Sequence, residues 1–292
     1  NQLFAQIPFT KVGKIVRIEN FTSNYIDSRN IDVWIPDGYS NNKKYAVLYM
    51  HDGQMLYDSN LTWNKKAWFV QNKAQQLMNE QKIKEVIIVG IFNNGKYRHS
   101  EYFPQKIAAI LPIPFKDSLI KNQLQNKPQS DNYLKFIVQE LKPYIDKNYA
   151  TLTDVENTFM MGSSMGGLIS LYGICEYPQV FGGVACLSLH SPMIAVKSAN
   201  FENNDYIPSQ LFLKYLENNL PQNPKKNIYM DYGDLTLDFY YKPFQLKIDR
   251  IFSKVGYTNQ NWQTTFFPGT DHSENAWANR VEIPLMFLLN KK

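Results

Sequence analysis

TFMMGSSMGGLISLYGICE, residues 158–176, carries the strongest structural signal in the chain. An apolar run at 158–161 leads into two glycines that flank a serine, and an apolar helical pattern follows. In this strand–turn–helix context the motif G-x-S-x-G predicts a sharp turn that projects the hydroxyl of Ser164. Gly162 and Gly166 let the turn close so tightly that the serine takes a strained backbone conformation. We therefore predict that Ser164 is a nucleophile.

The same turn has two other interpretations. A glycine-rich turn between a strand and a helix can simply pack, or it can bind a phosphate at the N-terminus of the helix. The usual phosphate-binding patterns, G-x-x-x-x-G-K-[ST] and G-x-G-x-x-G, do not occur in the chain. The nucleophile is therefore the favoured interpretation, and the helix that begins at Met165 would place its positive end beside a developing oxyanion.

Short apolar, β-branched or aromatic runs alternate with longer helical patterns along the rest of the chain. This alternation is typical of a parallel sheet whose strands are joined by crossover helices. The predicted class is α/β, with a mostly parallel central sheet of about eight strands and helices on both faces. The predicted strands are 14–18, 31–35, 45–50, 86–91, 158–161, 183–189, 227–231 and 264–267.

Six segments show the periodicity or composition of helices. In the second of them Ser130 is the expected N-cap, and Pro143 is expected to bend the helix or end it early. The predicted helices are 63–80, 131–147, 165–176, 209–218, 243–255 and 275–289.

Two stretches, 93–129 and 190–208, lack clear periodicity. Long irregular connections in an α/β domain are typical of functional loops above the carboxyl edge of the sheet. Both stretches are therefore predicted to be loop insertions near the active site. No repeat or linker interrupts the sequence, so we expect one domain over 1–292, with 1–30 as an N-terminal extension that holds the first strand.

A serine hydroxyl needs a neighbouring base, and the chain has four histidines. On a strand–turn–helix nucleophile the partners follow the serine in the order acid, then histidine, which excludes His51 and His99. His190 leaves no room for an intervening strand that carries the acid. His272 lies between the last predicted strand and the last predicted helix, so it is the predicted base.

The predicted strand 227–231 opens into the acidic sequence GDLTLD. A carboxylate in this loop would orient the imidazole of the base and stabilise its cation. Asp238 and Asp234 both qualify, and their spacing alone does not choose between them. Asp231 still lies within the strand and is expected to be structural.

A second oxyanion donor is expected from the loop after the third strand. That loop reads HDGQM at 51–55. The backbone N–H groups of Gln54 and Met165 are the predicted pair of donors. The candidate substrate contacts are His190, Tyr97 and Trp277, because aromatic and histidine side chains near the site can clamp an aromatic or sugar-linked group.

Composition excludes several classes of protein. The net charge is +5, from 31 basic and 26 acidic residues, and the lysines are scattered. Without a basic stripe or a recognisable module, no nucleic-acid partner is expected. No apolar stretch is long enough to cross a bilayer, so no membrane span is expected.

No metal or organic cofactor is expected from the sequence. The carboxylates at 231, 234 and 238 lack the ligand loop of a calcium site, including its terminal glutamate. The chain begins at Asn1 rather than at a methionine, so a processed or trimmed N-terminus is expected. The localisation stays open, with a secreted or periplasmic protein slightly favoured over a cytoplasmic one. The sequence gives no expectation about the oligomeric state.

These residues together resemble the putative esterase family of α/β-hydrolases, which includes feruloyl, acetylxylan and siderophore esterases and the mycolyltransferases. The resemblance runs from about Val33 to Leu289 and includes GSSMGG and GTDHSENAW in the order that is specific to the family. The matching stretches are YMHDGQMLYD at 49–58, ELKPYID at 140–146, GSSMGG at 162–167, DYGDLTLD at 231–238 and GTDHSENAW at 269–277.

The resemblance implies a serine esterase with Ser164 as nucleophile, His272 as base, and Gln54 and Met165 in the oxyanion hole. Relatives that carry DYG-T-E-T-L-D imply Asp238 rather than Asp234 as the acid. The implied substrate is a small-molecule or glycan-linked ester of the carbohydrate-linked, aromatic or siderophore type. Two alternatives are an acyltransferase on the same fold and a non-catalytic hydrolase-fold binding protein.

Overall fold

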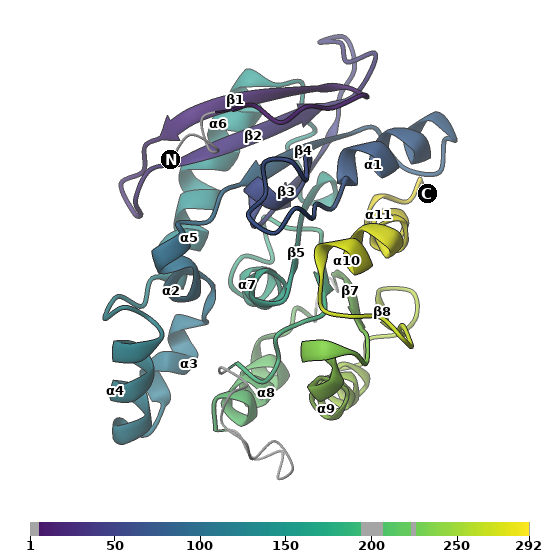
Figure 1. Cartoon of the computed structure of the whole chain (residues 1–292). Helices are drawn as coiled ribbons and strands as arrows, with labels where there is room; N and C mark the ends of the chain where they lie inside the picture. The colour runs from purple at the N-terminus through teal and green to yellow at the C-terminus, as the bar shows by residue number, and fades with distance from the viewer. Residues whose placement is uncertain (1–5, 194–206, 223–225, 292) are drawn as a thin grey trace.

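The computed structural model describes residues 6–193, 207–222 and 226–291. Its strands form one eight-stranded sheet in the order β1-β2-β4-β3-β5-β6-β7-β8 (Figure 1). β1 pairs antiparallel with β2, and β2 with β4, whereas β3 to β8 are all parallel. This arrangement confirms the predicted mostly parallel sheet. The strands are β1 (Lys14–Phe21), β2 (Arg29–Ile35), β3 (Ala46–Met50), β4 (Val86–Ile91), β5 (Thr158–Ser163), β6 (Gly183–Leu187), β7 (Asn227–Tyr232) and β8 (Trp262–Phe266).

Helices cover both faces of the sheet, as the sequence predicts (Figure 1). They are α1 (Val70–Asn79), α2 (Arg98–Tyr102), α3 (Gln105–Ile110), α4 (Ile113–Asn122), α5 (Ser130–Lys135), α6 (Lys142–Asn148), α7 (Met165–Glu176), α8 (Ile207–Asn219), α9 (Lys242–Lys254), α10 (Glu274–Arg280) and α11 (Glu282–Leu289). Val47 and Tyr49 of β3 belong to a buried cluster that draws on α2 to α9. Their neighbours Ala46, Leu48 and Met50 belong to a second cluster with α1, α10 and α11. The central strands read as continuous apolar runs because both of their faces are buried.

The predicted helix 63–80 begins only at Val70, so its predicted start is wrong. Phe69 precedes the helix with φ 49°, in the left-handed region, where a helix cannot continue. The backbone N–H of Trp68 donates to the carbonyl of Met55 at 3.1 Å. Residues 63–69 therefore lie along the loop that follows β3, and their apolar spacing serves tertiary contacts instead of a helix.

The stretch 93–129 was expected to be irregular, and this expectation is wrong. It contains the 3-10 turn η2 (Gly95–Tyr97) and the helices α2, α3 and α4. Pro104 and Pro112 stand at the N-caps of α3 and α4. Proline ends one helix and is well suited to the start of the next, because its φ is fixed and it has no N–H. Helices of only five to ten residues show too few turns for their periodicity to stand out.

Pro143 does not end its helix. A π-helical segment, η3 (Phe136–Leu141), joins α5 to α6 and ends two residues before this proline. A proline removes one backbone donor, and here the helix changes its hydrogen-bond spacing ahead of it. The N-cap prediction for Ser130 is wrong, because Ser130 is the first residue of α5 and its hydroxyl accepts from the backbone N–H of Gln105 at 2.8 Å.

The other predicted helices are present. α7 matches the prediction for 165–176, and α8 and α9 match theirs to within a residue or two at each end. The predicted helix 275–289 is divided into α10 and α11 at Val281. Within the predicted loop 190–208, residues 194–206 lie outside the described residues, and 207–208 begin α8.

A buried ion pair joins the helical stretch after β4 to the sheet. Arg29 of β2 donates from Nη1 and Nη2 to the two carboxylate oxygens of Glu101 in α2, at 2.8 and 2.6 Å. Both side chains are almost fully buried. Removing one partner of such a pair leaves the other charge buried without compensation, which costs about 3–5 kcal/mol.

We therefore expect Glu101→Gln to lower the free energy of unfolding by about 3 kcal/mol in urea titrations. The control is Glu85→Gln, which breaks the solvent-exposed pair with Lys43 and should change the same quantity by less than about 0.5 kcal/mol. Losses of equal size in the two variants would contradict an anchoring role for the buried pair.

Candidate active site

The turn between β5 and α7 has the strained geometry expected from the sequence. Ser164 has φ 56° and ψ −122°, outside the conformations that non-glycine residues normally adopt. A Cβ atom on Gly162 would lie 2.7 Å from the carbonyl carbon of Gly166, so only glycine fits there. The tight approach of these two glycines holds Ser164 at the start of α7.

His272 is hydrogen-bonded to one of the two carboxylates that the sequence left open. Its Nδ1 lies 2.6 Å from Oδ1 of Asp238, which is fully buried in the 3-10 turn η6 (Thr236–Tyr240). The backbone N–H of His272 donates to the hydroxyl of Thr236 at 2.9 Å, which joins the two loops. Asp234 instead accepts a hydrogen bond from the backbone N–H of Gly269 at 2.7 Å.

Hydrogen bonds keep Asp238 ionised. Burial by itself raises the pKa of this carboxyl group, but donors from His272, Ser188 and the backbone of Gly233 outweigh burial and hold the pKa below its ordinary value. A carboxylate on Nδ1 stabilises the tautomer that carries its proton on this nitrogen. The other ring nitrogen, Nε2, is then available to accept a proton.

The loop after β3 is fixed by a polar cluster. Asp52, at φ 55°, accepts from Nε and Nη2 of Arg98 at 2.7 and 2.8 Å, and from the side chain of Asn93 at 2.7 Å. The backbone N–H of Asn93 also donates to the side-chain oxygen of Gln54 at 3.2 Å. Gln54, a predicted oxyanion donor, therefore lies in a braced turn, and Met165, the other, is the buried first residue of α7.

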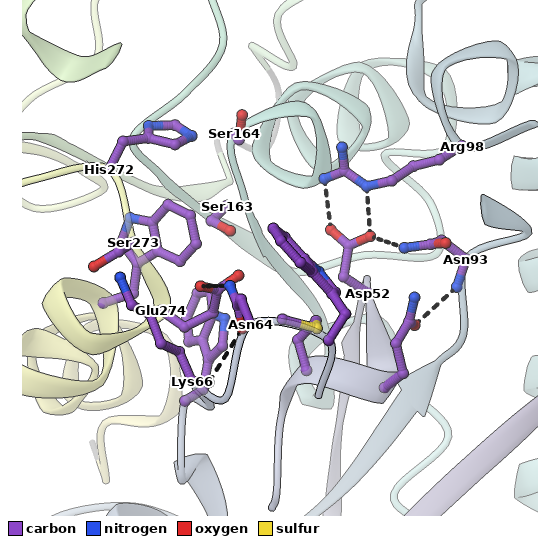
Figure 2. Close-up of a pocket in the computed structure, with 15 residues that line it drawn as sticks. Asp52, Asn64, Lys66, Asn93, Arg98, Ser163, Ser164, His272, Ser273 and Glu274 are labelled. Atoms are coloured by element: carbon purple, nitrogen blue, oxygen red, sulfur yellow. Dashed lines mark hydrogen bonds and ion pairs between the residues drawn. The ribbon is translucent and has the colours of Figure 1, made fainter. Parts of the chain in front are cut away.

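A pocket of about 540 Å³ brings these loops together. In Figure 2 the imidazole of His272 extends toward Ser164, and the paired Asp52 and Arg98 lie on the opposite wall. Trp63 lines the same pocket and is 83% exposed. The lining residues are Asp52, Gln54, Met55, Trp63, Asn64, Lys66, Trp68, Asn93, Arg98, Ser163, Ser164, His272, Ser273, Glu274 and Trp277.

Of the three predicted substrate contacts, the structure brings only Trp277 to the wall of this pocket. Its ring makes an edge contact with the imidazole of His272, with centroids 5.0 Å apart. Tyr97 lies in η2, where its ring faces the ammonium groups of Lys96 and Lys127. His190 is buried and is not among the lining residues.

Tyr241 is a neighbour of the site that sequence reasoning missed. Its hydroxyl lies 2.8 Å from Nδ1 of His190, and its ring makes an edge contact with His272. Burial raises the pKa of Tyr241 well above its ordinary value, and a hydrogen bond with Ser164 opposes that shift. Its position three residues after Asp238 was the only available signal.

Sequence reasoning also misses four lining residues, because the pattern of their segment predicts a helix. These residues are Trp63, Asn64, Lys66 and Trp68. Asn64 donates to the carboxylate of Glu274 at 2.9 Å, which ties this segment to the start of α10 (Figure 2). No sequence pattern pointed to this contact between residues so far apart in the chain.

Other kinds of site find no support in the part of the chain that the structure describes. Among those residues there is no group of three or more histidine, cysteine or acidic side chains that could hold a metal ion. None of the described helices is long and apolar enough to span a membrane.

The sequence matches the family described as putative esterase over residues 23–282. The match covers most of the chain, so the chain belongs to the putative esterase family, as its motifs indicated. An uncharacterised protein of Bacillus subtilis, YbbA, is 26% identical over 162 residues, which is 55% of this chain and 56% of that protein. The chain thus spans little more than half the length of this curated relative.

Solved structures share the α/β-hydrolase fold with this chain. The ferulic acid esterase of Anaeromyces mucronatus is 20% identical with a TM-score of 0.60, covering 99% of this chain and 96% of its own. The enterobactin esterase of Shigella flexneri is 15% identical with a TM-score of 0.62, covering 96% of this chain and 60% of its own. At these identities the likeness establishes the fold.

His51, next to the braced loop, is a buried titratable group outside the pocket lining. Its Nδ1 lies 2.8 Å from the hydroxyl of Tyr133, and its Nε2 has no hydrogen-bond partner among the described residues. Burial lowers the pKa of His51 to about 4; Asp52 opposes this shift and Arg98 reinforces it. His51 is therefore neutral in the folded protein at neutral pH.

Because this folded-state pKa lies below the value of about 6.5 for an unfolded histidine, the unfolded chain binds more protons between pH 6.5 and 4. The contribution of His51 to stability should therefore fall, by roughly 3 kcal/mol in total, as the pH is lowered through this window. Unfolding free energies measured between pH 4.5 and 7 should depend less on pH in His51→Gln than in the wild type. If the unfolding free energy depended on pH equally in both proteins, the pKa of His51 would not be lowered in the folded state.

Proposed function

We propose that this chain is a serine carboxylic-ester hydrolase, built as a single α/β-hydrolase domain, that works through an acyl-enzyme. The observation that carries the proposal is the hydrogen bond of 2.6 Å between the buried Asp238 and His272, which lines a pocket together with Ser164 on its strained turn. Membership of the putative esterase family supports the same reaction.

In the proposed reaction the ester carbonyl carbon binds to Oγ of Ser164 while Nε2 of His272 takes the hydroxyl proton. The backbone N–H groups of Gln54 and Met165 donate to the oxyanion that forms. His272 then gives its proton to the leaving alcohol as the ester C–O bond breaks. A water molecule repeats the sequence on the acyl-enzyme, which releases the acid and restores the serine.

The pocket suits an ester with an aromatic, carbohydrate-linked or siderophore-type group. Trp68 and Trp277 are neighbours in its wall, with ring centroids 5.6 Å apart and ring planes tilted by 34°, and Trp63 adds an exposed indole. Indole rings offer flat apolar area to aromatic or sugar rings. A volume of about 540 Å³ lies within the range of small-molecule sites. The ferulic acid and enterobactin esterases among the structural relatives agree with this range of substrates.

Intact-mass spectrometry after treatment with a fluorophosphonate tests the nucleophile. We expect one adduct on the wild type and none on Ser164→Ala, because only an activated serine attacks phosphorus at a useful rate. The matched control is Ser163→Ala, which removes the neighbouring hydroxyl in the same pocket and should leave the adduct in place. A folded wild-type protein without an adduct would favour a non-catalytic binding role.

A pair of aspartate variants tests the acid. Asp238→Asn should lower kcat on an aryl ester by about 10³- to 10⁴-fold, because an amide no longer stabilises the imidazolium. Asp234→Asn should keep kcat within about twofold, since the amide oxygen can still accept from Gly269. The reverse order of effects would assign the role of the acid to Asp234.

Product analysis with added alcohol separates hydrolysis, which gives only free acid, from acyl transfer.

A further inference from the structure

Ser188 occupies an unusual position directly after β6. It is fully buried and has φ 44°, in the left-handed region that serine rarely adopts. Its backbone N–H donates to Oδ1 of Asp231 at 3.0 Å. This backbone conformation puts its hydroxyl among three side chains, those of Asp238, Trp277 and Arg280.

The direction of each hydrogen bond at this hydroxyl follows from the chemistry of its neighbours. Nε1 of Trp277 and Nη2 of Arg280 lie 3.0 and 2.9 Å from Oγ of Ser188, and both groups can only donate. Together they occupy the two lone pairs of the hydroxyl oxygen. The hydroxyl proton is therefore committed to Oδ2 of Asp238, at 2.7 Å.

The donors behind Ser188 are themselves fixed. Arg280 forms a two-point pair with Asp231, from Nε to Oδ2 at 3.1 Å and from Nη2 to Oδ1 at 2.9 Å. Both side chains are buried. The hydroxyl of Tyr229 donates to Oδ2 of Asp231 at 3.1 Å. A rigid, charged unit therefore stands behind the serine hydroxyl.

Resting on the proposed function, we propose that Ser188 is a positioning residue for the reaction. Its hydroxyl connects the Arg280–Asp231 pair to Asp238, fixes the orientation of the carboxylate toward His272, and draws part of the carboxylate's negative charge away from the imidazole. Nothing in the active-site motifs of the sequence points to this residue.

The proposal predicts the direction in which the pH dependence changes when the hydroxyl is removed. Without the serine hydroxyl, Asp238 loses a donor and becomes a stronger acceptor for Nδ1–H of His272. The protonated imidazole is then more stable, so the base holds its proton to higher pH. The other ionisable groups around this pair are Asp231, Arg280 and Tyr241. Arg280 loses the serine hydroxyl as an acceptor, but its two-point pair with Asp231 remains.

The test is the pH profile of kcat/KM for aryl-ester hydrolysis in Ser188→Gly and Ser188→Ala. Both variants lack the hydroxyl, but glycine adopts φ 44° without strain, so the two differ in stability. In both we expect the ascending limb to move to higher pH and kcat at the plateau to fall roughly tenfold. The control is Ser191→Ala, which removes a buried hydroxyl without a hydrogen-bond partner among the described residues. It should leave the profile unchanged.

Two results would overturn the proposal: an ascending limb that stays in place in both Ser188 variants, or one that moves to lower pH. Lower activity with an unmoved limb counts as the first of these, since a merely structural role predicts it. An inactive wild type would instead be a failure of the proposed function. Nitrogen-15 NMR titration of His272, assigned with His272→Asn, then tests the same shift without turnover.

Discussion

The backbone at Ser164 is held in a conformation that it would not adopt alone. Its φ of 56° persists because Gly162 and Gly166 approach too closely for a relaxed turn to fit. Strain of this kind survives only where the surrounding structure over-determines it. Parallel strands end at one edge of the sheet, so the loops after β3, β7 and β8 meet the serine at this edge.

Positive φ angles recur after the strands beside it. Asp52, Ser164 and Ser188 each follow the end of a parallel strand, and each has a positive φ of 55°, 56° and 44°. Each residue lies in a different part of the candidate site: the loop after β3, the turn between β5 and α7, and the hydrogen bonds around Asp238. Regular strands thus end in three non-glycine residues whose backbone is fixed by neighbours rather than by local preference.

Two buried acidic side chains determine the arrangement of the polar residues behind the pocket. A buried carboxylate without donors is costly, and both Asp231 and Asp238 are fully buried. Arg280 donates hydrogen bonds to Asp231. The hydroxyl of Ser188 accepts from Arg280 and donates to Asp238, so it links the Arg280–Asp231 pair to the second carboxylate. The donors of Arg280, Trp277 and Ser188 all have acceptors. This group of side chains contacts His272 through Asp238.

Local signals were enough to predict the fold and the strained turn at Ser164. All eight strands follow from short apolar runs, and Ser164 follows from glycines that only a tight turn requires. His272 follows from its order in the chain. The strands and the turn depend on near neighbours in the sequence, whereas the prediction of His272 rests on its order after Ser164 and the acidic loop.

Only the tertiary structure shows the contact of His272 with Asp238 rather than Asp234, the course of residues 63–69 and the hydrogen bonds of Ser188. Asp238 meets His272 across 34 positions, and Ser188 meets Arg280 across 92. No local propensity encodes a hydrogen bond of that range. It is decided by which strands lie side by side and by the need of each buried polar group for a partner.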